Sequence, residues 1–350
     1  MSITLKDIAA RANVSVSTVS MVLNNKICRV SPQTRERIVR LAKEMNYRPN
    51  RQAASLVTRE SHTLGLIIPD ITNMYFSEIA AAIQSEAQKA GYSVFLCNTN
   101  DKPEQDIFYI NALLEQATDG VLLTLSATDS RNSAKECLQL LEEAGKPVVL
   151  IDRIVEEKPI CTVTTDNEQT GYLACHHLLA LGHRRIACLT GMMGDQAAQK
   201  RLFGYIQALQ EAHIPFDPTL VFEGDYHVAS GYERAMDIFQ TKATAIVVQN
   251  DMMALGVYKR LIQEGIRIPD DLSIIGVDDL PFSEFLETPL STIRQRPKEM
   301  GKTALQMLLS LLQRRPVKKE KVVFPPKLVT RKSTAAFPFL SAAARKGAGL

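Results

Sequence analysis

The spacing of hydrophobic positions changes near residue 60, which predicts that the chain is built from two different parts. Before that point, apolar residues recur at helical spacing in three short stretches. From His62 onward, short apolar runs alternate with longer amphipathic stretches. Because 350 residues are also too many for one compact core, we expect a small helical unit followed by a larger α/β body.

Helix-start signals place three helices in the first part. Thr4-Leu5-Lys6-Asp7 fits a capping box, which predicts a helix over about residues 5–12. After a short turn, Ser15 can cap a second helix that runs to about residue 23. Ser31-Pro32 then opens a third helix. The first two helices form a helix-turn-helix.

Short side chains line the exposed face of the second helix. A face that is only solvated favours Glu and Lys, whereas short hydroxyl and flexible apolar side chains suit close approach to base edges and phosphates. The exposed positions are Val16, Ser17, Thr18, Ser20 and Met21. The alternative interpretation is a small helical bundle without a ligand.

Basic residues are concentrated in the first part. Residues 1–60 hold 11 Lys and Arg against 4 Asp and Glu, a net charge of +7, so the total of +3 leaves −4 for residues 61–350. A concentrated positive unit is typical of proteins that bind the phosphate backbone, although solvated basic helices of this size are also common.

Residue spacing predicts no metal, no cofactor and no enzyme. The six cysteines are scattered, and the adjacent residues Cys175-His176-His177 of one helix point in different directions. There is no GxGxxG, GxSxG or P-loop motif. No apolar run approaches the ~18 residues of a membrane span and no secretory signal is visible, so we expect a cytoplasmic protein without membrane contact.

The second part alternates predicted strands and helices, and the order of elements occurs twice. The alternation predicts parallel sheets with right-handed crossovers. The strands are Leu64 to Pro69, Ser93 to Cys97, Gly120 to Thr124, Pro147 to Asp152, Arg185 to Gly191, Ala245 to Asn250 and Ser273 to Asp278. The helices include Phe76 to Ala90, Asn167 to Leu181, Leu202 to Ala212 and Met252 to Glu264.

Polar residues gather where three of these strands end, at Asp152-Arg153, Asn250-Asp251 and Asp278-Asp279. Ligands of such sheets bind beyond the carboxyl ends of the strands. A carboxylate can accept from two sugar hydroxyls, an Arg or Asn can donate, and an aromatic face can cover C–H groups. Further candidates in loops or helix starts are Asn73, Tyr75, Phe76, Arg201, Tyr226 and Gln295.

The first part resembles the LacI/GalR family of bacterial regulators, through Thr4-Leu5-Lys6-Asp7-Ile8-Ala9, Val14 to Ser20 and Asn24. The resemblance implies that Val16, Ser17 and Met21 read bases and that Ser15, Thr18 and Asn24 hold phosphates, with Thr4, Leu5 and Ser20 completing the DNA-binding set. A family member often carries a more polar residue where Met21 stands.

The segment after the third helix, Tyr47 to Leu56, taken alone could be a linker. The resemblance implies a hinge that becomes a helix on DNA and bends the duplex from the minor groove. Leu56 would be the wedge, Ala53 would allow close helix approach, and Asn50 and Arg51 would lie near the sugar-phosphate edges.

The resemblance continues over residues 62 to about 333, to the family's core and to ribose-type periplasmic sugar-binding proteins. It implies a two-lobed core of parallel sheets, preceded by the all-α helix-turn-helix domain, with a neutral sugar as effector. Nine candidates match the ribose-type contact pattern: Asn73, Tyr75, Phe76, Asp152, Arg153, Arg201, Asn250, Asp278 and Gln295. Met74 and Tyr75 depart from the usual residues. A purine effector and a sugar receptor without a DNA role are the alternatives.

The predicted organisation is a helix-turn-helix domain (1–47), a hinge (48–60), a two-lobed effector-binding and dimerisation domain (61–333) and a disordered tail without assigned function (334–350). Two-fold protein symmetry demands two-fold DNA symmetry, so the partners we expect are a second copy of the chain and a near-palindromic double-stranded operator. We therefore expect a repressor whose affinity for its operator is controlled by a small molecule.

Overall fold

Three helices lie in the described residues of the N-terminal unit, and the predicted helix starts are confirmed. They are α1 (Leu5–Ala12), α2 (Val16–Leu23) and α3 (Pro32–Glu44). Thr4 and Asp7 form the capping box, and Ser15 Oγ accepts from the Thr18 backbone N–H at 3.1 Å to cap α2. The buried core between the helices consists of Ile8, Ala9, Ala12, Val19, Val22, Ile38 and Ala42.

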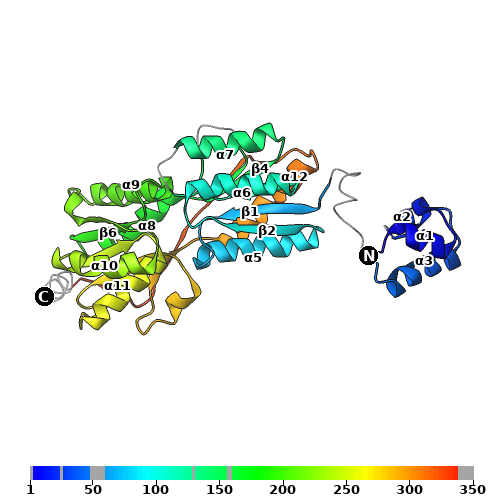
Figure 1. The fold of residues 1–350 in the computed structure, drawn as a ribbon. Helices are drawn as coiled ribbons and strands as arrows, with labels where there is room; N and C mark the ends of the chain where they lie inside the picture. The colour runs from blue at the N-terminus through cyan, green and yellow to red at the C-terminus, as the bar shows by residue number, and fades with distance from the viewer. Residues whose placement is uncertain (1–2, 24–26, 48–59, 128–130, 156–159, 338–350) are drawn as a thin grey trace, which may run out of the picture. The chain divides into compact units, whose positions relative to one another are not determined.

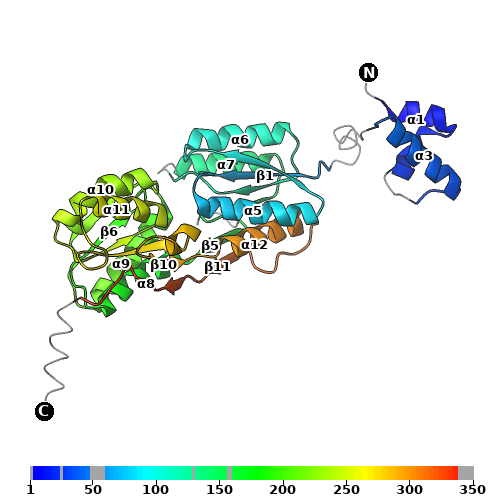
Figure 2. The same cartoon turned by 90° about the horizontal axis from the view of Figure 1, so that it is seen from below.

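The computed structural model describes residues 3–23, 27–47, 60–127, 131–155 and 160–337. The chain divides into two units, Met1–Ser61 and His62–Leu350 (Figures 1 and 2). Within the described ranges, no helix combines the length and the hydrophobicity needed to cross a bilayer.

The larger unit contains two six-stranded sheets, one in each of two lobes (Figure 1). The first sheet has the order β11-β5-β4-β3-β1-β2 and the second β12-β10-β9-β8-β6-β7. All neighbouring strands are parallel except β10 and β12, which are antiparallel. The first sheet comprises β1 (Thr63–Ile68), β2 (Ser93–Asn98), β3 (Gly120–Leu123), β4 (Val148–Ile151), β5 (Thr162–Thr165) and β11 (Lys321–Phe324). The second comprises β6 (Ile186–Thr190), β7 (Val221–Glu223), β8 (Ala245–Val248), β9 (Ser273–Asp278), β10 (Ser291–Arg294) and β12 (Lys327–Val329).

Helices cover both faces of each sheet, because both faces of the central strands are apolar. In the first lobe, Leu64, Leu66 and Ile68 of β1 face one core and Ile67 faces the other. The helices of this lobe are α5 (Met74–Lys89), α6 (Pro103–Glu115), α7 (Arg131–Glu143) and α12 (Pro297–Leu312). Those of the second lobe are α8 (Asn167–Ala180), α9 (Gln196–Glu211), α10 (Val228–Gln240) and α11 (Asp251–Gln263). Short 3-10 turns lie at Pro218–Leu220 and Pro281–Glu284. The predicted α/β fold class is confirmed.

The chain passes between the lobes three times. It leaves the first lobe after β5, returns between β10 and α12, and leaves again between β11 and β12. These crossings place residues 166–167 and 295–296 at the boundary of the lobes, next to the strand ends where the sequence predicts a site.

Two boundaries differ from the sequence prediction by more than two residues. The helix predicted from Leu202 begins at Gln196, because Asp195 caps it by accepting from the Ala197 backbone N–H at 2.9 Å. The tail predicted to be disordered from Thr334 is in part ordered, since His177 Nε2 bonds Thr334 Oγ1 at 3.0 Å and the Phe337 N–H donates to the Leu181 carbonyl at 2.8 Å. Residues 338–350 lie outside the described ranges.

Candidate functional site

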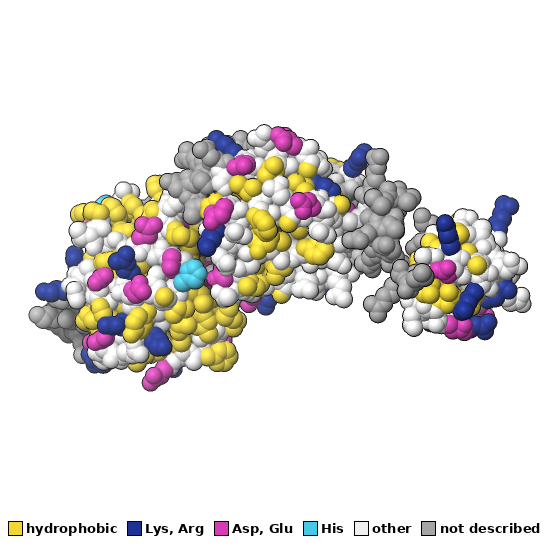
Figure 3. Space-filling model, viewed as in Figure 1, with side chains coloured by type: hydrophobic (Ala, Val, Ile, Leu, Met, Phe, Trp, Pro, Cys, Tyr) yellow, Lys and Arg dark blue, Asp and Glu magenta, His cyan; other side chains and the backbone are white. Residues whose placement is uncertain are grey.

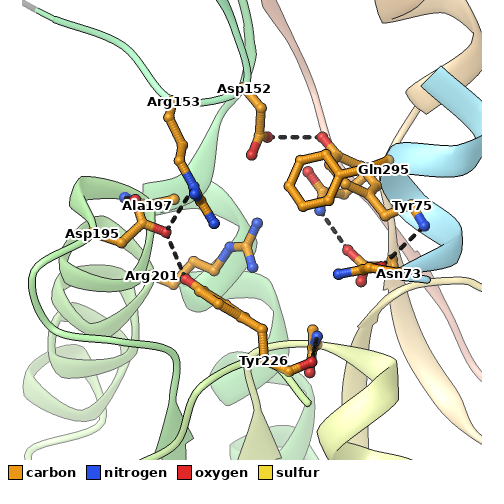
Figure 4. Close-up of a pocket in the computed structure, with 12 residues that line it drawn as sticks. Asn73, Tyr75, Asp152, Arg153, Asp195, Ala197, Arg201, Tyr226 and Gln295 are labelled. Carbon is orange, nitrogen blue, oxygen red and sulfur yellow. Dashed lines mark hydrogen bonds and ion pairs between the residues drawn. The ribbon is translucent and has the colours of Figure 1, made fainter. Parts of the chain in front are cut away.

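One cavity between the lobes brings together all ten predicted effector-binding residues (Figure 4). It encloses about 320 Å³ of space free of atoms, part of it open to solvent. The predicted residues in its wall are Asn73, Tyr75, Phe76, Asp152, Arg153, Arg201, Tyr226, Asn250, Asp278 and Gln295, and Asp195 and Ala197 complete the wall. Each lobe therefore contributes a part of the polar surface.

The first lobe contributes an aromatic pair and a carboxylate. Asn73 caps α5 by accepting from the Tyr75 N–H at 3.1 Å, which fixes the start of the helix at the cavity. The Tyr75 hydroxyl donates to Asp152 Oδ1 at 2.8 Å, and the Phe76 ring meets that of Tyr75 edge-on at 5.2 Å. Burial raises the pKa of Asp152, against the opposing effect of Arg201 and Arg153.

Arg153 is held mainly by its own lobe. Its Nη1 forms an ion pair with Asp101 and donates to the Leu125 carbonyl at 2.8 Å. The guanidinium also lies over the Phe76 ring, 5.8 Å from its centre. Its Nε is 3.7 Å from Asp195 Oδ2 of the other lobe and has no hydrogen-bond partner. Arg153 therefore ties three strand-end segments of the first lobe together and faces the second lobe across the cavity.

Arg201 is the buried cation of the second lobe. It lies in the second turn of α9, rather than in a loop or helix start as the sequence suggested. Its Nε donates to Asn167 Oδ1 at 2.8 Å and its Nη1 to the Gln249 carbonyl at 2.6 Å. No described residue accepts from Nη2, so this group can donate to a ligand. At 5% exposure, Arg201 can be approached only from the cavity.

The Asn250 side chain mainly holds α11 and Tyr226 in place at the cavity wall. Its Oδ1 caps α11 by accepting from the Met253 N–H at 2.9 Å, and its Nδ2 donates to the Tyr226 carbonyl at 2.8 Å. The Tyr226 hydroxyl donates to Asp195 Oδ2 at 2.8 Å. These bonds fix the plane of the Tyr226 ring along the cavity wall (Figure 4).

Asp278 and Gln295 form the third polar group. Gln295 Nε2 donates to Asp278 Oδ1 at 2.6 Å, while Gln295 Oε1 is buried without a hydrogen-bond partner. Burial, and next to it repulsion from Asp251, holds the pKa of Asp278 well above its usual range. A buried carboxyl and an unpaired amide oxygen are costly when unsatisfied and suit a ligand that brings hydroxyl groups.

The backbone is strained at the same place. Left-handed φ angles occur at Asp152 (67°), Tyr226 (69°), Asp278 (117°) and Asp279 (62°). Residues with side chains rarely adopt these angles, and such strain gathers at ligand-binding sites. The turns direct the strand-end side chains toward the cavity.

Sequence reasoning missed Asp195. The residue is 5% exposed and accepts from both the Ala197 N–H and the Tyr226 hydroxyl. Its position as an Asp before a helical stretch was the available signal, but the predicted helix began six residues too late, which hid the cap.

Six predicted DNA-reading residues lie on α2 or directly before it, and two lie at the start of α1. Val16 is 40% exposed, Ser15 and Ser17 are exposed, and Thr18, Ser20 and Met21 are half-buried. Thr4 is exposed at the α1 cap, whereas the Leu5 side chain packs against the core of the unit. Asn24, Asn50, Arg51, Ala53 and Leu56 lie outside the described residues.

The histidines that follow Cys175 have structural contacts. His176 stacks on Tyr172, and His177 bonds Thr334. Among the residues that the structure describes, no group of three or more Cys, His, Asp and Glu side chains could hold a metal ion.

Comparisons with known proteins match both parts of the chain. Residues 4–50 match the model of bacterial regulatory proteins of the lacI family, and residues 175–334 match a periplasmic binding protein-like domain. The HTH-type transcriptional repressor PurR of Vibrio atlanticus is 35% identical, over 94% of this chain and 97% of its own.

Solved structures of transcriptional regulators are also similar to this chain. The lac repressor dimer bound to operator and the anti-inducer ONPF has a TM-score of 0.86 and 32% identity, and the match covers 96% of this chain and 100% of that one. A LacI family transcriptional regulator from Enterococcus faecium with bound ribose has a TM-score of 0.71 and 31% identity, covering 79% and 99%.

Fold, site and relatives thus define a two-lobed ligand-binding regulator with a helix-turn-helix. The chain belongs to the LacI family of bacterial regulatory proteins and is a DNA-binding transcriptional regulator. The relatives are transcriptional regulators rather than enzymes.

Proposed function

We propose that this regulator is a repressor whose affinity for a near-palindromic operator is controlled by a small neutral sugar. The observation that carries the effector assignment is the composition of the interlobe cavity. Its wall presents two arginines, three carboxyls, an unpaired amide oxygen and three aromatic rings. That combination recognises a polyol, because each hydroxyl both donates and accepts.

The charges of the cavity support a neutral ligand over a phosphorylated or acidic one. Arg153 is already paired with Asp101, and Arg201 lies among Asp152, Asp278 and Tyr226. No excess positive charge is left to balance a phosphate. The E. faecium regulator, whose structure contains ribose, is a relative with a ligand of the proposed kind.

A purine effector is the second candidate, and the aromatic rings favour it. Tyr75, Phe76 and Tyr226 border the cavity, and planar bases stack on such rings. The similarity to a repressor named PurR agrees with this candidate. We place it second because the carboxyls and buried amide outnumber the groups that a flat base could contact at its edge.

The DNA-reading roles follow from α2. We assign base contacts to Val16, Ser17 and Met21, and phosphate contacts to Ser15, Thr18 and Asn24. Val16 and Ser17 occupy the exposed first turn, where a recognition helix meets base edges. Ser15 Oγ also bonds Thr18 Oγ1 at 2.8 Å, which orders both hydroxyls at the start of the helix.

The hinge carries the remaining DNA-binding assignments. We assign Asn50, Arg51 and Ala53 to the minor-groove side of the operator and Leu56 to the wedge between central base pairs. These assignments rest on the family resemblance alone, because the four residues lie outside the described part of the chain. The proposed domain limits 1–47, 48–60 and 61–333 rest on the same basis.

Coupling between sugar and DNA requires the ligand to prefer one arrangement of the lobes. The cavity meets that requirement, since Asp152 and Tyr75 belong to one lobe and Arg201 and Asp278 to the other. A ligand that bonds both groups favours the closed cleft. Its binding energy is then available to change the hinge.

We propose a homodimer, which the exposed apolar side chains of the body support. Phe95 and Leu96 of β2 are 45% and 47% exposed, Phe108 of α6 is 60% exposed and Phe285 is 82% exposed. Figure 3 shows hydrophobic side chains at the visible surface of the body. Phe95 and Leu96 lie on the edge strand β2, and exposed apolar side chains at a sheet edge are typical of interaction surfaces. Because the proposed partner is chromosomal DNA, we place the protein in the cytoplasm, without catalytic activity or cofactor.

A thermal-shift panel on the full chain tests the effector assignment. We expect a pentose, hexose or disaccharide to raise the melting temperature, and Arg201→Lys to abolish the rise by removing the planar donor group. Lys242→Arg, at an exposed turn, is the control that keeps the response. Stabilisation by hypoxanthine or guanine alone would replace the sugar by a purine.

A further inference from the structure

A second cavity adjoins the first on the side of the β5–α8 crossing. It encloses about 630 Å³ of space free of atoms, part of it open to solvent. Its wall includes the segment from Thr164 to Glu168, the start of α9 with Gln196, and Lys321 and Val323 of β11. Asp152, Arg153 and Ala197 line both cavities. Figure 4 shows Arg153, Ala197 and Asp195 grouped on one side of the first cavity.

Unpaired buried polar atoms mark both cavities. In the described part of the chain, five buried side-chain atoms have no hydrogen-bond partner: Thr124 Oγ1, Arg153 Nε, Gln196 Oε1, Arg260 Nε and Gln295 Oε1. Gln295 lines the first cavity, Arg153 lines both and Gln196 lines the second. Native proteins leave few such atoms, so three along one pair of cavities need an explanation.

The chemistry of these atoms describes a ligand that reaches across both cavities. The two amide oxygens need donors, and the Arg153 Nε–H at the junction needs an acceptor. The Arg153 side chain is 7% exposed, and its Nε forms no hydrogen bond but lies 3.7 Å from Asp195 Oδ2, so a closer acceptor at the junction would complete its contacts. Hydroxyl groups at both ends and an oxygen between them satisfy all three.

The second cavity has no dominant charge. Its charged wall residues balance in number, with Arg153, Lys200 and Lys321 opposite Asp152, Asp166 and Glu168. A wall with balanced acids and bases suits a neutral polyhydroxyl group, which accepts from an ammonium and donates to a carboxylate.

We infer that the effector has two rings, with one sugar ring in the first cavity and a second sugar unit in the cavity lined by Gln196. This inference rests on the proposed sugar-effector function and extends it from a sugar to a disaccharide. Gln196 Oε1 accepts from a hydroxyl of the second unit, and Arg153 Nε donates to an oxygen at the junction.

Calorimetric titration of the full-length protein tests the inference. The probes are glucose, galactose and ribose as single rings, and cellobiose, maltose, trehalose, lactose and melibiose as two-ring sugars. We expect one two-ring sugar to bind at least tenfold more tightly than either of its component sugars. A charge-free hydrogen bond and added apolar contact together correspond to about this factor.

Gln196→Met separates the second cavity from the first. The variant keeps the length of the side chain and removes the unpaired amide. We expect the two-ring sugar to lose about tenfold in affinity, its single-ring component to change less than twofold, and the ligand-free protein to melt no lower than the parent. Gln199→Met, at an exposed position of the same helix, is the matched control and should leave both affinities unchanged.

The outcomes distinguish the inference from the function beneath it. If a single-ring sugar binds as tightly as every two-ring sugar, or if Gln196→Met leaves the preference intact, the second subsite is refuted and the sugar effector stands. If no sugar binds, whether or not a purine does, both the subsite and the sugar effector are refuted.

Discussion

Asp278 and Asp279 are adjacent carboxylates with opposite predicted roles, so replacing each by Asn separates ligand binding from stability. Asp278 faces the cavity and bonds only Gln295 among the described residues. Asp279 faces away and accepts from Arg294 Nε at 2.5 Å and Arg331 Nη2 at 2.6 Å. We predict that Asp278→Asn weakens effector binding without loss of stability, and that Asp279→Asn does the reverse.

The magnitudes follow from these contacts. A hydrogen bond to a charged group contributes about 1.5–3 kcal/mol, so Asp278→Asn should raise the effector Kd roughly 10- to 150-fold. Stability should not fall, because the Asn carbonyl still accepts from Gln295. Moreover, burial raises the pKa of Asp278, so the folded state binds its proton more tightly and loses stability as the pH rises toward that pKa. The Asn side chain of the variant has no proton to lose, so the stability of this variant does not fall in that pH range.

Asp279→Asn leaves two guanidiniums with a neutral partner. Arg331 is 15% exposed and Arg294 is 49% exposed, so water screens the second pair and the combined cost is about 2 kcal/mol. For a body of this size that corresponds to a melting temperature lower by roughly 4–8 °C.

The assay is calorimetric titration of both variants with the effector identified in the thermal-shift panel, together with thermal unfolding at pH 8. An effector Kd unchanged by Asp278→Asn would refute the assignment of this carboxyl to ligand binding. A shift of similar size in both variants would show that the lobe boundary, and not the carboxyl itself, determines affinity.

Two further predictions concern buried polar groups around the site. Burial raises the pKa of Asp106 to about 6, so its contribution to stability is complete below about pH 4 and is lost as the pH rises through 6. Asp106→Asn should therefore raise the free energy of unfolding at pH 8 by up to about 3 kcal/mol, measured by urea unfolding, and leave it unchanged at pH 4. An equal increase at both pH values would show that the carboxyl's titration is not the cause. Asn250→Ala should lose about 2 kcal/mol, because it removes the α11 cap and the bond to the Tyr226 carbonyl, and Asn250→Ser should recover part of it by restoring the cap. Urea unfolding of the parent and the two variants measures this, and an Asn250→Ser variant no more stable than Asn250→Ala would contradict the prediction.

Local signals carried most of the sequence prediction. The capping box at Thr4, the caps at Ser15 and Ser31 and the buried strands were readable because each depends on a few neighbouring residues. Strand-end polar residues predicted the cavity because parallel strands end at one edge of a sheet. Asp152, Arg153, Asn250 and Asp278 line it for that reason.

What the sequence did not reveal depends on distant partners. Asp195 owes its place to Tyr226 and Arg153, which are far away along the chain. Asn250 lines the cavity as predicted, and its side chain also caps α11 and bonds the distant Tyr226 carbonyl. The ordered contacts of Thr334 and Phe337 likewise come from α8 and its end, which no local pattern of small residues can indicate.

The central claim, that this protein reads DNA through α2 as a symmetric pair, is tested most directly by selecting duplexes from a random library with the full-length protein. The account predicts enrichment of one near-palindrome with two inverted half-sites, and a changed base preference at symmetric positions with Ser17→Ala. Enrichment of an asymmetric site, or of the same site by the parent and by the Ser17 variant, would contradict the account.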